Sequence, residues 1–180
     1  MISKHLLVSG LALLLFTTAC NKEVDELPGA TDTGANTFGA KVNGTYWVPA
    51  RFGIIPSDNL LRAWFTSPES IMIRANNFSQ TPNETGFEIQ IGGVDGPGTY
   101  YLNQNISKPT TAGYGYYVKR TFTPTGEWQT STHFTGSVTI TKLDYVNKIV
   151  AGSFEFTAGS LTGSGESITV TDGRFDIKYE

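Results

Sequence analysis

The chain is poor in the residues that most often carry chemistry. It has a single cysteine, Cys20, and its one histidine beyond the first twenty residues is His133. One cysteine excludes an intramolecular disulfide. A typical structural zinc site needs four nitrogen or sulfur ligands, which this composition does not provide. We therefore expect a fold without disulfides, and no metal or other cofactor.

Charge is also scarce. Charged residues make up 16% of the chain and the formal net charge is -3. The only adjacent lysine and arginine residues are Lys119 and Arg120. Nucleic-acid binding requires a clustered basic surface, so we expect no nucleic-acid partner. Attraction to anionic lipid headgroups is equally unsupported, and any membrane attachment must be covalent.

No apolar run is long enough to cross a bilayer as a helix, which needs about 20 residues. The longest, Leu6 to Phe16, has eleven residues and follows the basic pair Lys4-His5. Small residues come next and end at Cys20, in a pattern that resembles a bacterial lipobox. The whole leader predicts a lipoprotein signal peptide at 1–19. The alternative is an ordinary secretory signal with a coincidental cysteine.

The lipobox resemblance implies that Cys20 is acylated, by diacylglycerol and then a fatty acid such as palmitate, and so anchors the chain to a membrane. We expect a location in the cell envelope, at the outer membrane and with a surface-exposed form as one option. Asn21 to Glu26 is similar to the export signal of Bacteroidota surface lipoproteins, although a charged linker explains it equally well. Residues 20–36 lack aromatic residues and predict a flexible tether.

Residues 37–180 predict a single β-domain. Asn43-Gly44 is a strong hairpin signal, and apolar residues alternate with polar ones over 134–141 and 150–156. The alternation changes parity at Asp172-Gly173, which predicts a β-bulge with Gly173 at positive φ, or failing that a tight hairpin. Residues 123–126 read as a loop. The result is an all-β fold, an antiparallel β-sandwich or barrel of about nine to ten short strands.

Three segments resemble one known group of proteins. These are Phe38 to Trp47 with its Asn-Gly turn, Gly98-Thr99-Tyr100-x-Leu102, and the closing pair Gly152 to Phe156 and Thr171 to Phe175. They are similar to an uncharacterised family of small Bacteroidota lipoproteins, a domain of unknown function. The resemblance implies an all-β fold behind a lipobox leader. It implies no catalytic residues.

Signals of catalysis are weak. There is no Gly-x-Ser-x-Gly elbow, and a serine–histidine–acid triad would have to use His133. Thiol catalysis is excluded if Cys20 is acylated. Paired carboxylates for glycoside hydrolysis remain open, because the domain has several glutamates: Glu84, Glu88, Glu127, Glu155 and Glu166. We predict no catalytic residues and a protein that is not an enzyme.

Aromatic residues gather in the middle of the domain. Tyr101, Tyr114, Tyr116 and Trp128 are the candidate ligand contacts, because rings beside glycines can stack on a sugar or contact a protein. Ordinary packing within the sheet is the competing explanation. The sequence favours a non-catalytic binding or assembly module on the cell envelope, with a glycan or an envelope protein as partner. The alternatives are a polysaccharide-acting enzyme and a lipocalin-like carrier of a small apolar ligand.

Overall fold

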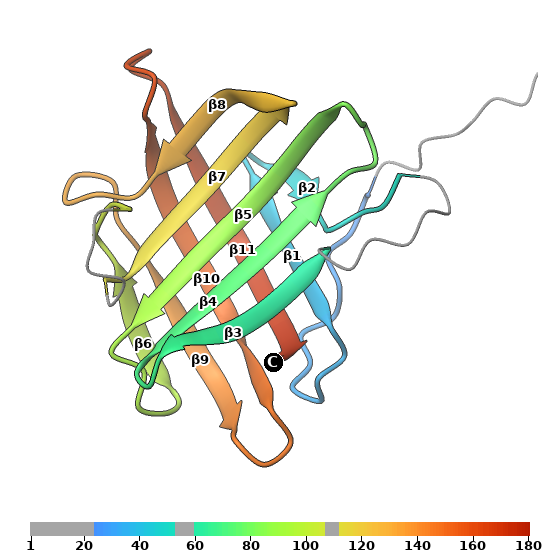
Figure 1. The fold of residues 1–180 in the computed structure, drawn as a ribbon, viewed down its shortest axis with the longest axis vertical. Helices are drawn as coiled ribbons and strands as arrows, with labels where there is room; N and C mark the ends of the chain where they lie inside the picture. The colour runs from blue at the N-terminus through green and yellow to red at the C-terminus, as the bar shows by residue number, and fades with distance from the viewer. Residues whose placement is uncertain (1–23, 53–59, 107–111) are drawn as a thin grey trace, which may run out of the picture.

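The structure is a computed structural model, and it describes residues 24–52, 60–106 and 112–180. Within these ranges all regular structure is β-strand. Figure 1 shows the eleven strands. Their bounds are β1 Thr37–Val42, β2 Thr45–Trp47, β3 Leu61–Ser67, β4 Ser70–Asn77, β5 Asn83–Gly92, β6 Gly98–Leu102, β7 Tyr114–Thr121, β8 Thr123–Gln129, β9 Gly136–Asp144, β10 Ile149–Ser160 and β11 Ser167–Lys178.

All eleven strands belong to one antiparallel sheet, which confirms the all-β prediction. The main path runs β2-β1-β11-β10-β8-β7-β5-β4-β3. Strand β10 is long enough to have two neighbours on its other edge, β9 along its first part and β8 at its end, and β6 pairs with β9. The sheet is not closed into a barrel.

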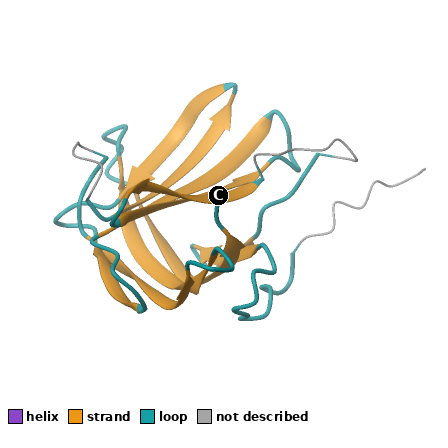
Figure 2. Ribbon diagram, turned by 60° about the horizontal axis from the view of Figure 1, so that its bottom comes forward, coloured by secondary structure: helices purple, strands orange, loops and turns teal. Residues whose placement is uncertain are grey.

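The sheet folds over so that β3, β4, β5, β7 and β8 form one layer, which crosses in front of β1, β10 and β11 (Figures 1 and 2). Phe87 of β5 lies between the layers. Its ring is 5.6 Å from that of Phe38 in β1, 4.7 Å from Trp47 in β2 and 6.2 Å from Phe154 in β10. Such edge-on and tilted ring contacts add specific packing energy to simple burial.

Alternation along β9 and β10 produces this core as expected. Val138 and Ile140 of β9 are buried, as are Phe154 and Phe156 of β10, while the polar residues between them face outward. In a strand, successive side chains point to opposite faces, so a period of two places one set against the facing layer. The inward and outward sets predicted for this hairpin are confirmed.

The bulge predicted at Asp172-Gly173 is also present, with one correction. Strand β11 has one extra residue relative to both neighbours at this point. The residue at positive φ is Asp172 (φ 54°), whereas Gly173 was expected there. Gly173 is needed for a different reason: a Cβ on it would lie 2.4 Å from the carbonyl oxygen of Phe154. Asp tolerates the left-handed region better than most side chains.

The loop predicted at 123–126 is wrong. These residues begin β8, because Thr121 and Thr123 pair directly and Phe122 alone turns the chain. Pro124 misled the interpretation, since proline cannot donate a hydrogen bond within a sheet. Beyond β7, however, β8 pairs only through Trp128 and Gln129, so its first residues lie on an edge where proline is tolerated.

The segment before β1 lies against the sheet. We call residues 27–36 the N-terminal strap. Asp176 of β11 faces outward beneath it and is only 1% exposed, since the strap covers it. Its carboxylate accepts hydrogen bonds from the hydroxyl of Thr31 (2.7 Å) and from the backbone N–H groups of Thr33 (2.9 Å), Gly34 (2.6 Å) and Ala35 (3.1 Å).

Further contacts fix the strap near its start and in its middle. Arg174 donates to the carbonyl of Pro28 at 3.2 Å, and Lys142 donates to the carbonyl of Asp32 at 2.8 Å. Gly39 of β1 allows the close approach, because a Cβ there would lie 2.8 Å from Cδ of Pro28. The stretch predicted to be a flexible tether is therefore bound to the domain in this part. The strap has the composition of a linker. Its contacts to the domain use mostly backbone groups, and a composition does not reveal such contacts.

Candidate functional site

The front layer carries a groove on its outer face, away from the core. It has a volume of about 580 Å³. Its walls come from β3, β4, β5, β7 and the start of β8, which are adjacent in the sheet (Figure 1). The lining residues are Arg62, Arg74, Asn76, Phe78, Gly86, Phe87, Glu88, Tyr116, Val118, Arg120, Phe122 and Pro124.

The floor of the groove is apolar. Gly86 of β5 pairs directly with Val118 of β7, and both line the groove. A Cβ on Gly86 would lie 2.9 Å from Oδ1 of Asn76 and 3.3 Å from the carbonyl oxygen of Ala75. Glycine is therefore the residue that leaves this part of the surface hollow.

One end of the groove is formed by an arginine, a glutamate and a tyrosine. Arg74 and Glu88 are cross-strand partners, and their side chains form an ion pair at 2.9 Å. The hydroxyl of Tyr114 donates to the other carboxylate oxygen of Glu88 at 2.8 Å. Burial raises the pKa of Tyr114 and the negative charge of Glu88 raises it further, so the phenol stays protonated and remains a donor.

Tyr116 lies next to this group on β7. Its hydroxyl donates to Glu127 of β8 at 2.5 Å. Burial is the largest cause of its raised pKa, followed by the bond to Glu127. Glu88 and Glu127 therefore each hold a tyrosine hydroxyl, and both carboxylates are fixed in orientation by a neutral donor.

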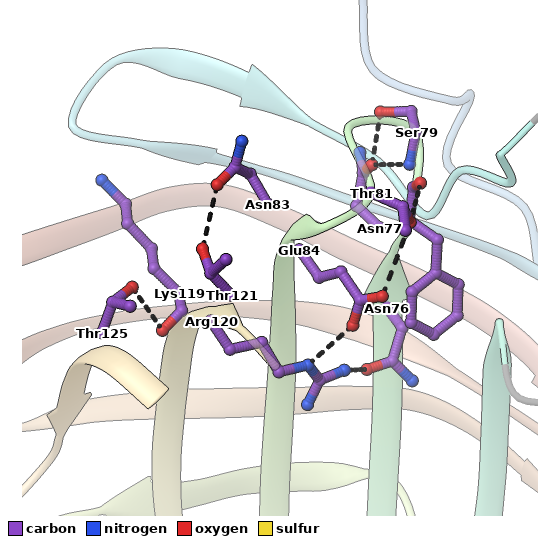
Figure 3. Close-up of polar contacts among 11 residues, drawn as sticks. Asn76, Asn77, Ser79, Thr81, Asn83, Glu84, Lys119, Arg120, Thr121 and Thr125 are labelled. Atoms are coloured by element: carbon purple, nitrogen blue, oxygen red, sulfur yellow. Dashed lines mark hydrogen bonds and ion pairs between the residues drawn. The ribbon is translucent and has the colours of Figure 1, made fainter. Parts of the chain in front are cut away.

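The other end of the groove contains Arg120, which joins two neighbours (Figure 3). Its Nε is 3.0 Å from a carboxylate oxygen of Glu84, and its Nη2 donates to Oδ1 of Asn76 at 3.0 Å. Beside it, the hydroxyl of Thr121 donates to Oδ1 of Asn83 at 2.9 Å. These bonds link the ends of β4, β5 and β7 into one polar rim.

Positive charge in the groove is balanced. Arg74 is paired with Glu88, Arg120 with Glu84, and Arg62 with the terminal residue Glu180 at 2.5 Å. A free anion would have to compete with a carboxylate at each arginine. The groove therefore offers fixed donors and acceptors rather than a field of one sign.

The four aromatic residues selected from the sequence do not form one site. Only Tyr116 lines the groove, and Tyr114 reaches it through Glu88 while its own ring is buried. Trp128 is buried beside Tyr117, with ring centroids 6.0 Å apart. Tyr101 lies on β6, in the other branch of the sheet, and is 72% exposed.

Several groove residues were not identified from the sequence. Arg74 and Asn76 alternate with buried Ile73 and Ala75, so their outward direction was visible in the pattern. The pattern could not show that β4 pairs with β5 and that β5 pairs with β7. Only that pairing brings Arg74 beside Glu88 and Glu84 beside Arg120.

The remaining candidates lie apart. Of the glutamates considered for hydrolysis, Glu84, Glu88 and Glu127 are on the groove side, whereas Glu155 is on β10 and Glu166 is in the exposed turn after it. His133 is exposed. Within the described residues no group of histidine, cysteine, aspartate and glutamate is arranged to hold a metal ion. Cys20 lies outside the described residues.

Comparison with known proteins adds no relative. No family model matches the chain, and neither a curated protein nor a solved structure is similar to it. Among the residues that the structure covers, no helix is long and apolar enough to cross a membrane.

Proposed function

We propose that this protein is a non-catalytic, lipid-anchored binding module of the cell envelope, and that its groove binds an uncharged carbohydrate. The observation that carries the proposal is the combination of an apolar floor, Gly86 and Val118, with arginine, glutamate and tyrosine groups on both sides. A sugar ring presents the matching pattern, since its C–H groups are apolar and its hydroxyls both donate and accept.

Charge balance supports a neutral ligand. Each arginine of the groove already has a carboxylate partner. Paired arginine and glutamate groups hold each other in fixed positions, so they lose little freedom when a hydroxyl binds. A sulfated or phosphorylated ligand would gain most from unpaired cations, which favours the neutral class.

The interior of the sheet favours this surface over the lipocalin-like alternative. Contacting rings occupy the space between the layers, among them Phe38, Phe87 and Phe154. A carrier would need that space for its ligand.

The enzyme alternative has one specific observation in its favour. Glu88 and Glu127 both lie beside Tyr116, and paired carboxylates are the machinery of most glycoside hydrolases. Each, however, accepts a hydrogen bond from a tyrosine, and Glu88 is also paired with Arg74. Both carboxylates are therefore already engaged by groups of the protein, whereas the two catalytic carboxylates of a glycosidase must flank the glycosidic bond.

Affinity electrophoresis tests the binding proposal. The full chain is run through gels that contain starch, xyloglucan, galactomannan or laminarin. We expect retardation in at least one gel, and loss of it in Arg74→Ala, because that change removes a donor and leaves Glu88 held by Tyr114 alone. Thr139→Ala, on the outer face of β9, is the matched control and should migrate as wild type.

If the wild type migrates in all four gels as it does without polysaccharide, the carbohydrate proposal is contradicted. Release of reducing sugar from the retarding polysaccharide, abolished by Glu88→Gln, would favour the enzyme instead. Both assays use the same preparation.

The anchor is tested separately. The intact mass and membrane fractionation of the full chain are compared with those of Cys20→Ala. Acyl mass on the wild type and its sedimentation with membranes, both lost in the variant, are the expected results. Two soluble proteins without acyl mass would mean a free secreted domain.

A further inference from the structure

Phe122 occupies an unusual position for an aromatic residue. Its φ is 64°, in the left-handed region that bulky side chains rarely adopt, and its side chain is 89% exposed. The ring thus gains little from burial, while the backbone bears a disfavoured conformation. Backbone outliers of this kind concentrate at functional sites, because the surrounding structure must hold them in place.

The turn explains the conformation but not the side chain. Thr121 and Thr123 are direct partners, so Phe122 must reverse the chain by itself. Glycine or asparagine would meet that requirement at lower cost. The aromatic ring must therefore be accounted for by what lies beside it.

The ring lies at the end of the groove. Phe122 lines it together with Phe78 and Pro124, next to the polar group formed by Arg120, Glu84 and Asn76. A flat apolar surface next to fixed hydrogen-bonding groups is the arrangement that a pyranose ring requires, with one face to stack and an edge of hydroxyls.

We propose that Phe122 is the stacking platform for one pyranose ring of the bound glycan. This inference rests on the proposed function. It narrows the ligand to neutral sugars that present a face of C–H groups alone, such as β-linked glucose, and it places that ring over the β7–β8 turn. Arg120 and Asn76 then bind the ring hydroxyls from the side.

The test uses three variants of the full chain, titrated calorimetrically with the polysaccharide that retards the wild type. Phe122→Asn keeps a residue suited to the left-handed turn and removes the ring. We expect it to lower affinity about tenfold or more. Phe122→Tyr should stay within about threefold of wild type, because its ring can stack equally well. Arg74→Ala reports on the groove itself.

Thermal unfolding separates binding from folding. The midpoint of Phe122→Asn should equal or exceed that of the wild type, since asparagine tolerates positive φ better. A stable variant with weakened binding would support a role in the ligand site.

Three results would overturn the inference. If Arg74→Ala loses affinity while Phe122→Asn keeps it, the groove binds glycan without the platform, and only this inference fails. If the wild type binds none of the four polysaccharides, the proposed function fails with it. Loss of binding to lipid vesicles in Phe122→Asn, with glycan affinity unchanged, would also assign the ring to a membrane and count against stacking.

Discussion

The two outer faces of the folded sheet differ in what covers them. The face of β11 is covered by the N-terminal strap, whose backbone N–H groups surround the buried carboxylate of Asp176. The face of β4, β5 and β7 is left open. Its carboxylates pair with arginines that remain partly accessible, and they accept hydrogen bonds from tyrosine hydroxyls. One polar face is thus covered by the strap, and the other is left open to solvent.

The strands of both faces have the same kind of sequence, in which apolar residues alternate with polar residues that point outward. The difference arises from chain outside the sheet. On the β11 side the strap supplies several donors to one acceptor, so a charge can be buried without loss. On the groove side the charges satisfy one another and stay near water, where ion pairs contribute little to stability.

The largest expected effect therefore concerns Asp176. Asp176→Asn replaces one acceptor with an amide that faces backbone donors, and we expect it to lower the free energy of unfolding by about 3 kcal/mol. Asp172→Asn, the same change on an exposed carboxylate of the same strand, should cost far less. Urea unfolding measures both. Equal effects would erase the distinction between a buried and an exposed carboxylate on this strand.

The pH dependence of stability sharpens the same contrast. Burial alone would raise the pKa of Asp176, but hydrogen bonds from Thr31, Ala35, Gly34 and Thr33 outweigh it and hold the pKa below its ordinary value. A depressed carboxyl pKa stabilises the fold above the unfolded value, about 3.9, and this contribution is lost as pH falls through the folded value.

We therefore expect the stability difference between the wild type and Asp176→Asn to be constant above about pH 5 and to shrink in more acidic solution. Urea unfolding curves of both proteins, recorded between about pH 7 and pH 3, measure this difference. A difference that grows on acidification would mean that folding raises the pKa of Asp176 above its unfolded value.

A smaller effect is expected for the partly buried network of the groove. Arg120→Ala removes the bonds to Glu84 and Asn76, and we expect a loss of about 1 kcal/mol in chemical unfolding. A cost as large as that of Asp176→Asn would mean that the groove face also serves mainly for stability.

The smallest effect should come from Arg62→Ala. Its pair with Glu180 is exposed, so we expect only a small loss of stability, which should disappear in high salt. Measuring the variant at low and high ionic strength separates charge from packing on Trp64, whose ring lies 5.5 Å from the Arg62 guanidinium carbon. A large, salt-independent loss would assign the effect to that packing.

The sequence was sufficient for the fold class and for individual hairpins. Alternation over 134–156 depends only on local geometry, and so the buried faces of β9 and β10 could be assigned. The parity change at 172–173 likewise revealed the bulge. The turn at Phe122 was not predicted, because Pro124 is typical of a loop. Proline is tolerated there only because the first part of β8 lies at an edge of the sheet, which the sequence does not show.

The groove could not be predicted because it depends on which strands are neighbours. Arg74 and Glu88 are in different strands, and Arg120 reaches Asn76 across β5. The binding of the strap to the domain could not be predicted either, for a different reason. The composition of the strap is that of a linker, and most of its bonds to the domain use backbone N–H and carbonyl groups, which composition does not reveal.

The most direct test is an NMR titration of the isotopically labelled chain with the neutral polysaccharide that retards it, cut to a short oligosaccharide. We expect shifted amide signals for Gly86, Glu88, Tyr116 and Phe122, and unchanged signals for Thr139 and Ser153 on the outer face of β9 and β10. Shifts confined to β9, β10 and β11 would contradict it, because the ligand would then bind the face on which the strap lies.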